Sequence, residues 1–141
     1  MKHLKLFILV VGISFLPKVM NAQVRELTQR ELYEKVLNSY DNGDYTYKND
    51  KPCVVLFFNP YCPYSRQMET TLATVANKGE FKNEVNFYKI NIWKIDDNTL
   101  EYLGLEGAPS ILFMDTDGEF EIEKGTATTE LLEDLIYDYF D

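Results

Sequence analysis

One cysteine stands where a helix is expected to begin. Cys62 follows an apolar run and a short turn, and Pro63 suits the first helical position because its missing N–H would be unpaired there anyway. Cys62 is therefore expected at the N-cap, facing unpaired backbone N–H groups and the positive end of the helix dipole. Both stabilise a thiolate, the form of cysteine that attacks disulfides. The pattern indicates a reactive thiol.

Two neighbours are expected to assist this sulfur. Ser65 lies one helical turn along on the same side, where its hydroxyl can donate a hydrogen bond to the sulfur, and Arg66 adds positive charge. The Cys-x-x-Ser spacing alone is also compatible with a buried structural cysteine. A buried strand, an aromatic turn, a proline and an amphipathic helix surround this one, and that context favours a reactive cysteine.

The position of the second cysteine and the scarcity of histidine limit which reactions the chain can catalyse. Cys53 begins the strand that ends beside Cys62, and a strand covers about 3.3 Å per residue, so the two are too far apart for a disulfide. We interpret Cys53 as a small buried hydrophobe. The only histidine, His3, lies in a segment that we expect to be removed. Histidine-dependent nucleophiles and zinc sites are thereby excluded, and no cofactor or metal is predicted.

Residues 1–22 are typical of a secretory signal peptide. A basic start is followed by the apolar run Leu6–Leu16 and a small residue, Ala22. The run is shorter than the about 20 residues that a membrane-spanning helix needs. We predict cleavage after Ala22, with a retained anchor as the alternative. Export is expected, to a Gram-negative periplasm or out of the cell.

The remaining chain, residues 23–141, is strongly acidic. It carries 11 basic and 23 acidic side chains, a net charge of −12, because residues 1–22 contain three lysines and no acid. Such a domain repels nucleic acid and anionic membranes, so neither is an expected partner after cleavage. Its length fits a single domain with its own core.

The elements that must position Cys62 follow from periodicity. We predict a first helix from Thr28, opened by a Thr28–Glu31 capping box and ended by Asp41–Asp44, with an apolar face of Leu32, Tyr33, Val36, Leu37 and Tyr40. Strands are predicted at 53–58, 85–92, 111–114 and 120–124, and further helices from 63 with a buried stripe that reaches 76, at 98–103 and at 129–140. This order predicts an α/β fold, a mixed central sheet with helices on both faces.

A second motif precedes the strand at 111–114. Gly104–Ser110 contains Pro109, which stands directly before that strand. X–Pro bonds tolerate the cis form far better than other peptide bonds. An ordinary trans proline at a strand start fits equally well, and spacing does not decide between them.

Residues 52–125 resemble thioredoxin-like proteins, especially small exported thioredoxin-related domains. Segment 57–68, Phe-Phe-Asn-Pro-Tyr-Cys-Pro-Tyr-Ser-Arg-Gln-Met, is similar to the family's Phe-x-x-x-x-Cys-x-x-Cys-Lys-x-Met. Segment 103–114 with Asp117 and Gly118 is similar to Tyr-Gly-x-x-Gly-x-Pro-Thr, strand, Asp/Asn-Gly. Gly125 matches a glycine that usually precedes the last helix.

The resemblance implies a thioredoxin fold and a set of site residues. Cys62 takes the place of the nucleophilic cysteine and Pro109 that of the cis-proline beside it. Ala108 would offer backbone groups to an extended substrate peptide. The residues expected to contact substrate around the sulfur are Tyr61, Pro63 and Tyr64.

Two departures from the family pattern leave two functional hypotheses. Ser65 replaces the second cysteine, and Leu56 stands where thioredoxin has a buried acid. The first hypothesis is monothiol exchange: Cys62 forms mixed disulfides with client proteins or small molecules, and an external thiol or redox partner releases them. The alternative is a redox-inactive module that kept a peptide-binding groove. A calcium site at 115–119 is less favoured, because the loop is too short for an EF-hand. A hairpin turn explains this segment better.

Overall fold

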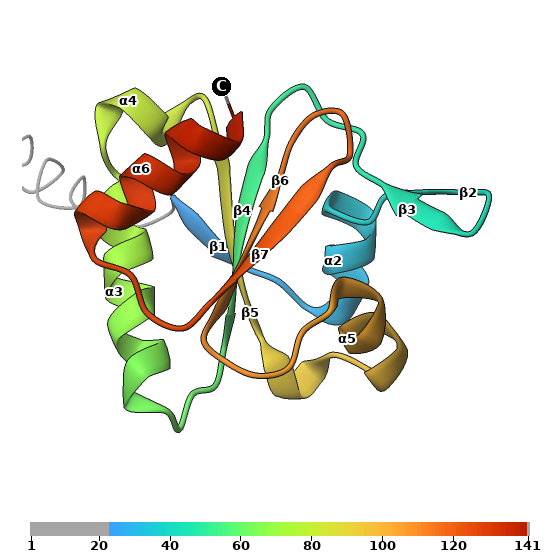
Figure 1. Ribbon diagram of the computed structural model, residues 1–141, viewed down its shortest axis with the longest axis horizontal. Coiled ribbons are helices and arrows are strands. Elements are labelled where there is room, and N and C mark those ends of the chain that lie inside the picture. The colour runs from blue at the N-terminus through green and yellow to red at the C-terminus, as the bar shows by residue number, and fades with distance from the viewer. Residues whose placement is uncertain (1–22, 141) are drawn as a thin grey trace, which may run out of the picture.

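The computed structural model describes residues 23–140 (Figure 1). The predicted signal segment and its cleavage site lie outside this range. In chain order the elements are β1 (Val24–Glu26), α2 (Gln29–Lys35), β2 (Ser39–Asp41), β3 (Asp44–Thr46), β4 (Cys53–Phe58), α3 (Pro63–Ala76), α4 (Gly79–Lys82), β5 (Asn86–Asn91), a 3₁₀ turn (Ile92–Lys94), α5 (Asp97–Leu103), β6 (Ser110–Met114), β7 (Phe120–Lys124) and α6 (Thr129–Phe140).

A mixed five-stranded sheet forms the middle layer, in the order β1-β5-β4-β6-β7. Strands β1, β5 and β4 are parallel, whereas β6 runs antiparallel to β4 and β7 antiparallel to β6. Helices α3, α4 and α6 lie on one side of the sheet, and α2 and α5 on the other (Figure 1). The predicted fold class, a mixed sheet with helices on both faces, is confirmed.

Strand β4 is the centre of the core because helices cover both of its faces. All six of its residues are buried. Val54 and Leu56 belong to the apolar cluster beneath α3 and α6, and Val55 and Phe57 to the cluster beneath α2 and α5. Each large apolar side chain buried in this way stabilises the fold by about 1.5–3 kcal/mol. None of the helices in residues 23–140 combines the length and apolar character needed to cross a membrane.

Helix α3 forms where the sequence predicts it. Pro63 occupies its first turn, and Cys62 is the N-cap with extended backbone angles, φ −97° and ψ 121°. The predicted apolar stripe faces the core, and its members, Met68, Leu72, Val75 and Ala76, are all fully buried. Packing of this stripe fixes the helix against β4, so the position of Cys62 is set by the core.

The N-terminal third differs from the prediction in two places. The capping box of Thr28 and Glu31 is present, but α2 ends at Lys35 and does not reach Tyr40. Strands β2 and β3 instead pair as a hairpin whose turn, Asn42-Gly43, has φ values of 53° and 92°. Asn-Gly is a strong signal for such a turn, so the prediction that Asp41–Asp44 ends a helix is wrong. Tyr40 is accordingly exposed and packs on Tyr45 across the hairpin, 4.8 Å between ring centroids.

The prediction also missed strand β1. Its three residues, Val24–Glu26, pair in parallel with Phe87–Lys89 of β5. The segment is too short for an alternating pattern, so sequence periodicity gives no signal for it.

Candidate functional site

Cys62 lies at the edge of the sheet where two parallel strands end. Phe58, the last residue of β4, is opposite Asn91, the last residue of β5. The chain then turns through Asn59-Pro60-Tyr61 and enters α3 at Cys62, at the lower end of the molecule in Figure 1. The thiol is free and partly exposed. Cys62 is therefore partly in contact with solvent at this end of the sheet.

Asn59 holds the turn that precedes Cys62, a role that the sequence analysis missed. Its carbonyl accepts a hydrogen bond from the N–H of Cys62 (3.0 Å). Its side-chain Oδ1 accepts one from the N–H of Tyr61 (2.9 Å), and its own N–H donates to Ser65 Oγ (3.0 Å). The available signal was the Asn-Pro pair, because asparagine side chains often bond the backbone two residues on.

Ser65 makes a hydrogen bond with the backbone of Asn59, in addition to the contact with the Cys62 sulfur that the sequence predicts. Its side chain is fully buried, and Oγ accepts the hydrogen bond from Asn59 N–H. A hydroxyl that accepts one hydrogen bond still has its own proton to donate. Ser65 therefore ties the turn to the helix and remains a donor beside the sulfur.

The surroundings of Cys62 favour the thiolate. The pKa of the Cys62 thiol is lowered, first by the backbone N–H of Ser65, then by the N–H of Tyr64, the Ser65 hydroxyl and the charge of Arg66, against an opposing effect of desolvation. The Cys62 side chain makes no capping hydrogen bond in the structure. These groups therefore lower the pKa because they stabilise the negative charge of the thiolate, and they do not depend on a capping hydrogen bond made by the neutral thiol.

The Pro109 loop approaches the same end of the sheet. Ser110 pairs with Phe57 across the antiparallel β4–β6 ladder, so the residue before it lies beside the turn that leads to Cys62. The Ala108–Pro109 bond is cis, Pro109 is buried, and its carbonyl accepts a hydrogen bond from Gly125 N–H (2.9 Å). A hollow of about 270 Å³ is lined by residues 106–110, Lys124 and Gly125.

Three aromatic side chains are exposed on the segments that follow the ends of β4 and β5. Tyr61 is 84% exposed and Tyr64 is 64% exposed, and Pro63 between them is also on the surface. Trp93, which the sequence analysis did not single out, is 72% exposed. It follows the end of β5 by two residues, and β5 ends beside β4, so Trp93 lies at the same end of the sheet as the turn before Cys62.

Cys53 and Leu56 have no part in this site. Cys53 is fully buried at the other end of β4, and burial raises the pKa of its thiol to about 12. Leu56 is buried among apolar side chains. Opposite Leu56 on β5, Lys89 pairs with Glu69 of α3 (3.0 Å). In residues 23–140 no three His, Cys, Asp or Glu side chains are grouped so that they could hold a metal ion.

Comparison with known proteins gives a consistent match. Residues 44–139 match the thioredoxin-like domain family. Thioredoxin from Borreliella burgdorferi is 24% identical over 114 residues, which cover 81% of this chain and 95% of that protein. The chloroplastic thioredoxin-like protein HCF164 of Arabidopsis thaliana is 32% identical over 78 residues, 52% of this chain and 28% of that protein.

Solved structures agree on the fold. Chloroplastic thioredoxin z superposes with a TM-score of 0.65 at 16% identity, covering 83% of this chain and 94% of that one. Thioredoxin of Malassezia sympodialis (Mala s 13) gives a TM-score of 0.63 at 15% identity, over 82% of this chain and 90% of that one. At these identities the likeness concerns the fold alone.

Proposed function

Because the chain belongs to the thioredoxin-like domain family, we propose that it carries out thiol–disulfide exchange through one cysteine, Cys62. Family membership supports a thiol–disulfide redox role in general. The monothiol form of that role rests on one observation: Cys62 is partly exposed at a helix N-terminus with a lowered pKa, and a buried serine stands where a second cysteine would resolve it.

The first step consumes a disulfide and releases a thiol. The Cys62 thiolate attacks one sulfur of a client disulfide, a bond forms between the two sulfurs, and the other client sulfur leaves as a thiolate. The N–H groups of Ser65 and Tyr64 and the Ser65 hydroxyl stabilise the attacking thiolate. Tyr61, Pro63 and Tyr64 supply exposed contact area for the client around the sulfur.

Release of the client requires a second thiol. Ser65 has no sulfur, and Cys53 is buried at the far end of β4, so neither can attack the mixed disulfide. An external small thiol, a redox partner or another thiol of the client must do so. The backbone of Ala108, directly before Pro109, is proposed to hold the client segment meanwhile, as a strand alongside the loop.

The alternative is a peptide-binding module without redox chemistry. Two observations favour it: Ser65 is engaged in bracing the turn, and Leu56 provides no buried carboxylate for proton transfer. In that case Cys62 forms no mixed disulfide, and only the groove around Pro109 and the exposed aromatics would serve binding.

The pH dependence of Cys62 alkylation in a Cys53→Ala variant separates the two. A thiol pKa well below about 8.5 supports exchange. The same protein should form a mixed disulfide with a small aromatic disulfide, detected as a mass increase lost in Cys62→Ser. An ordinary pKa together with no adduct would rule out exchange and leave the binding module.

Ser65→Cys is the matched variant for the monothiol step. With a second thiol at position 65, the mixed disulfide should be resolved internally and the adduct should not accumulate. In the natural sequence the adduct should persist until an external thiol is added. Equal persistence in both proteins would contradict the role assigned to position 65.

We also propose that the protein is exported and cleaved after Ala22, which rests on the signal-like pattern of residues 1–22. N-terminal sequencing of the protein from the producing cell's envelope or medium should begin at Gln23. A start at Met1 in a membrane fraction would favour the retained anchor.

A further inference from the structure

Strand β7 forms one edge of the sheet, with β6 as its neighbour on the inner side. Among residues 23–140 no strand pairs with its outer side, so a row of backbone N–H and C=O groups faces outward there. Such a row can accept an extended segment of another protein, which gains main-chain hydrogen bonds by adding to the sheet. The side chains beside the edge decide which segment fits.

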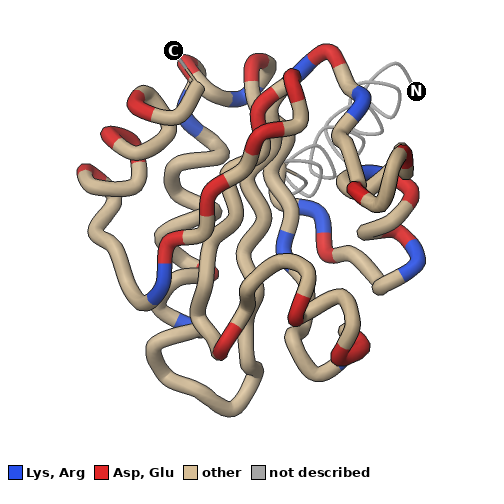
Figure 2. The backbone as a smooth tube through the Cα atoms, turned by 45° about the vertical axis from the view of Figure 1, so that its right-hand side comes forward, with Lys and Arg blue, Asp and Glu red and all other residues tan. Residues whose placement is uncertain are grey.

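Acidic residues occupy every second position from the turn before β7 to its end, namely Asp115, Asp117, Glu119, Glu121 and Glu123. Successive side chains of a strand point to opposite faces. Within β7, Phe120 and Ile122 pack on the core beneath α2 and α5, so Glu121 and Glu123 share the opposite face. Acidic positions crowd this part of the chain in Figure 2.

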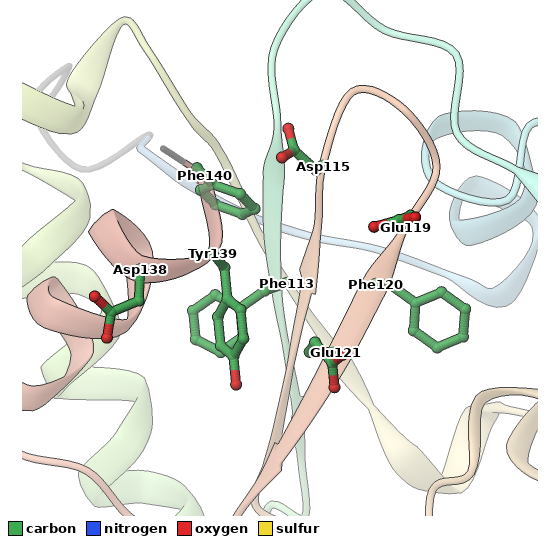
Figure 3. Close-up of a pocket in the computed structure, with 8 residues that line it drawn as sticks. All are labelled: Phe113, Asp115, Glu119, Phe120, Glu121, Asp138, Tyr139 and Phe140. Carbon is green, nitrogen blue, oxygen red and sulfur yellow. The ribbon is translucent and has the colours of Figure 1, made fainter.

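A hollow of about 180 Å³ lies beside this acidic face, between β7 and the end of α6 (Figure 3). The rings of Phe113 and Tyr139 lie close together in it, 4.9 Å between centroids, whereas the ring of Phe120 points to the other side of the strand. The acidic residues that line the hollow are Asp115, Glu119, Glu121 and Asp138, and no Lys or Arg lines it. It has room for the end of one long side chain.

The carboxylates at this hollow have no cationic partner within the described chain. The ion pairs formed by residues 23–140 use other acids, and Lys124 at the end of β7 is paired with Glu106 (2.7 Å). The Tyr139 hydroxyl donates to Glu123 (2.5 Å). That bond, with burial and the charges of nearby carboxylates, raises the pKa of Tyr139 to about 12, so its ring stays neutral.

We propose that β7 binds an extended segment of a partner protein that carries Lys or Arg at alternate positions. Opposite charges directly across a strand pair are stabilising, and the acidic face of β7 offers them at the period of a strand. One basic side chain would enter the hollow, its charge near Glu119 and Glu121 and its stem against the ring of Tyr139. The same carboxylates repel acidic strands and so select the partner. The site does not depend on Cys62.

The test uses two short synthetic peptides of equal composition and charge. One alternates Lys and Val, and the other has its lysines in one block. Calorimetry at low salt should show the alternating peptide binding about tenfold more tightly, because only it places each lysine on the acidic face. Amide shifts of the labelled protein should be confined to β7 and the end of α6.

Matched variants separate this site from the general acidity of the protein. Glu119→Gln with Glu121→Gln should weaken the alternating peptide about tenfold. Glu26→Gln with Glu101→Gln removes the same charge from the opposite edge of the sheet and from α5, and should change affinity less than about twofold. Equal affinity for the two peptides, equal losses in the two variants, or no binding of either peptide would each overturn the proposal.

Discussion

The two cysteines of the domain sit at opposite ends of one strand and have opposite chemistry. Cys53 opens β4 with its side chain fully buried, and its pKa is raised to about 12. Cys62 follows the end of β4 after a short turn, is partly exposed at the N-cap of α3, and has a lowered pKa. The residue type is the same, so reactivity here is a property of position: an apolar interior opposes the thiolate, and backbone N–H groups at a helix start favour it.

The most direct way to break this comparison is to remove each sulfur in turn. Cys62→Ser should abolish mixed-disulfide formation with a small disulfide while changing the free energy of unfolding by less than about 0.5 kcal/mol, since the site is near the surface. Cys53→Ala should leave adduct formation intact and destabilise the fold by about 1–2 kcal/mol through lost packing. Adduct mass and urea unfolding measure both. An adduct that survives in Cys62→Ser would place the reactive thiol at Cys53.

In the protein without substitutions, the alkylation rates of Cys53 and Cys62 should differ almost as strongly as the effects of removing each sulfur. At pH 7 a thiol of pKa about 12 is ionised at least about a thousandfold less than an ordinary one, and Cys53 is also inaccessible. Peptide mapping after brief iodoacetamide treatment should find label on Cys62 alone, with Cys53 labelled only after unfolding. Comparable labelling of both in the native state would contradict the buried position of Cys53.

Alkaline pH should expose the cost of burying Cys53. Its folded pKa is raised, so its contribution to stability is complete below about pH 9 and is lost as the pH rises toward 12. In that window the loss approaches about 1.4 kcal/mol per pH unit. Urea unfolding at pH 8 and pH 10 should show the natural protein losing more stability than Cys53→Ala does. Parallel losses would mean that Cys53 does not titrate in this way.

Ser65→Ala should change the reactivity of Cys62 by a smaller factor than removal of either sulfur does. Loss of the hydroxyl removes a donor near the thiolate, so the Cys62 pKa should rise and alkylation at pH 7 should slow by roughly threefold. The N–H of Asn59 also loses its acceptor, at a cost of about 1–3 kcal/mol in unfolding free energy. Ser65→Thr, which keeps the hydroxyl, is the control. A stability loss with an unchanged pH profile would make Ser65 purely structural.

Arg66→Gln should have the smallest effect. Arg66 is exposed and is the weakest of the influences on the Cys62 thiol, so the alkylation rate at pH 7 should fall by less than about twofold. The difference should disappear at high salt, where exposed charges are screened. A large effect that persists in salt would indicate a direct contact with the sulfur.

Much of the scaffold was open to prediction because its signals are local. The capping box of Thr28 and Glu31, the continuous apolar run of β4 and the proline at the start of α3 each act within a few residues. The hairpin turn at Asn42-Gly43 also has a local signal, although the same residues are compatible with the end of a helix. Strand β1 was not predictable, because three residues acquire their structure only by pairing with β5.

The site was predictable in its positions and less so in its contacts. Sequence placed Cys62 at the N-cap and Ser65 one turn on, as the structure has them. It could not indicate that Ser65 Oγ accepts a hydrogen bond from Asn59, because that depends on how the turn folds back over the helix. The exposure of Trp93 likewise depends on the pairing of β4 with β5.

The hydrogen bonds around Asn59 have an entropic consequence. Three of them fix the turn, one to Cys62 itself and one to the start of the helix. The backbone freedom of this segment is therefore given up once, during folding, rather than each time a disulfide arrives. The N–H groups of Ser65 and Tyr64, which lower the pKa of Cys62, belong to the helix start that this turn fixes, so they need little reorganisation when charge forms on the sulfur. The surroundings of the Cys62 sulfur are therefore ordered before a disulfide arrives. The rate of exchange then depends on how the disulfide approaches the sulfur and on which thiol leaves.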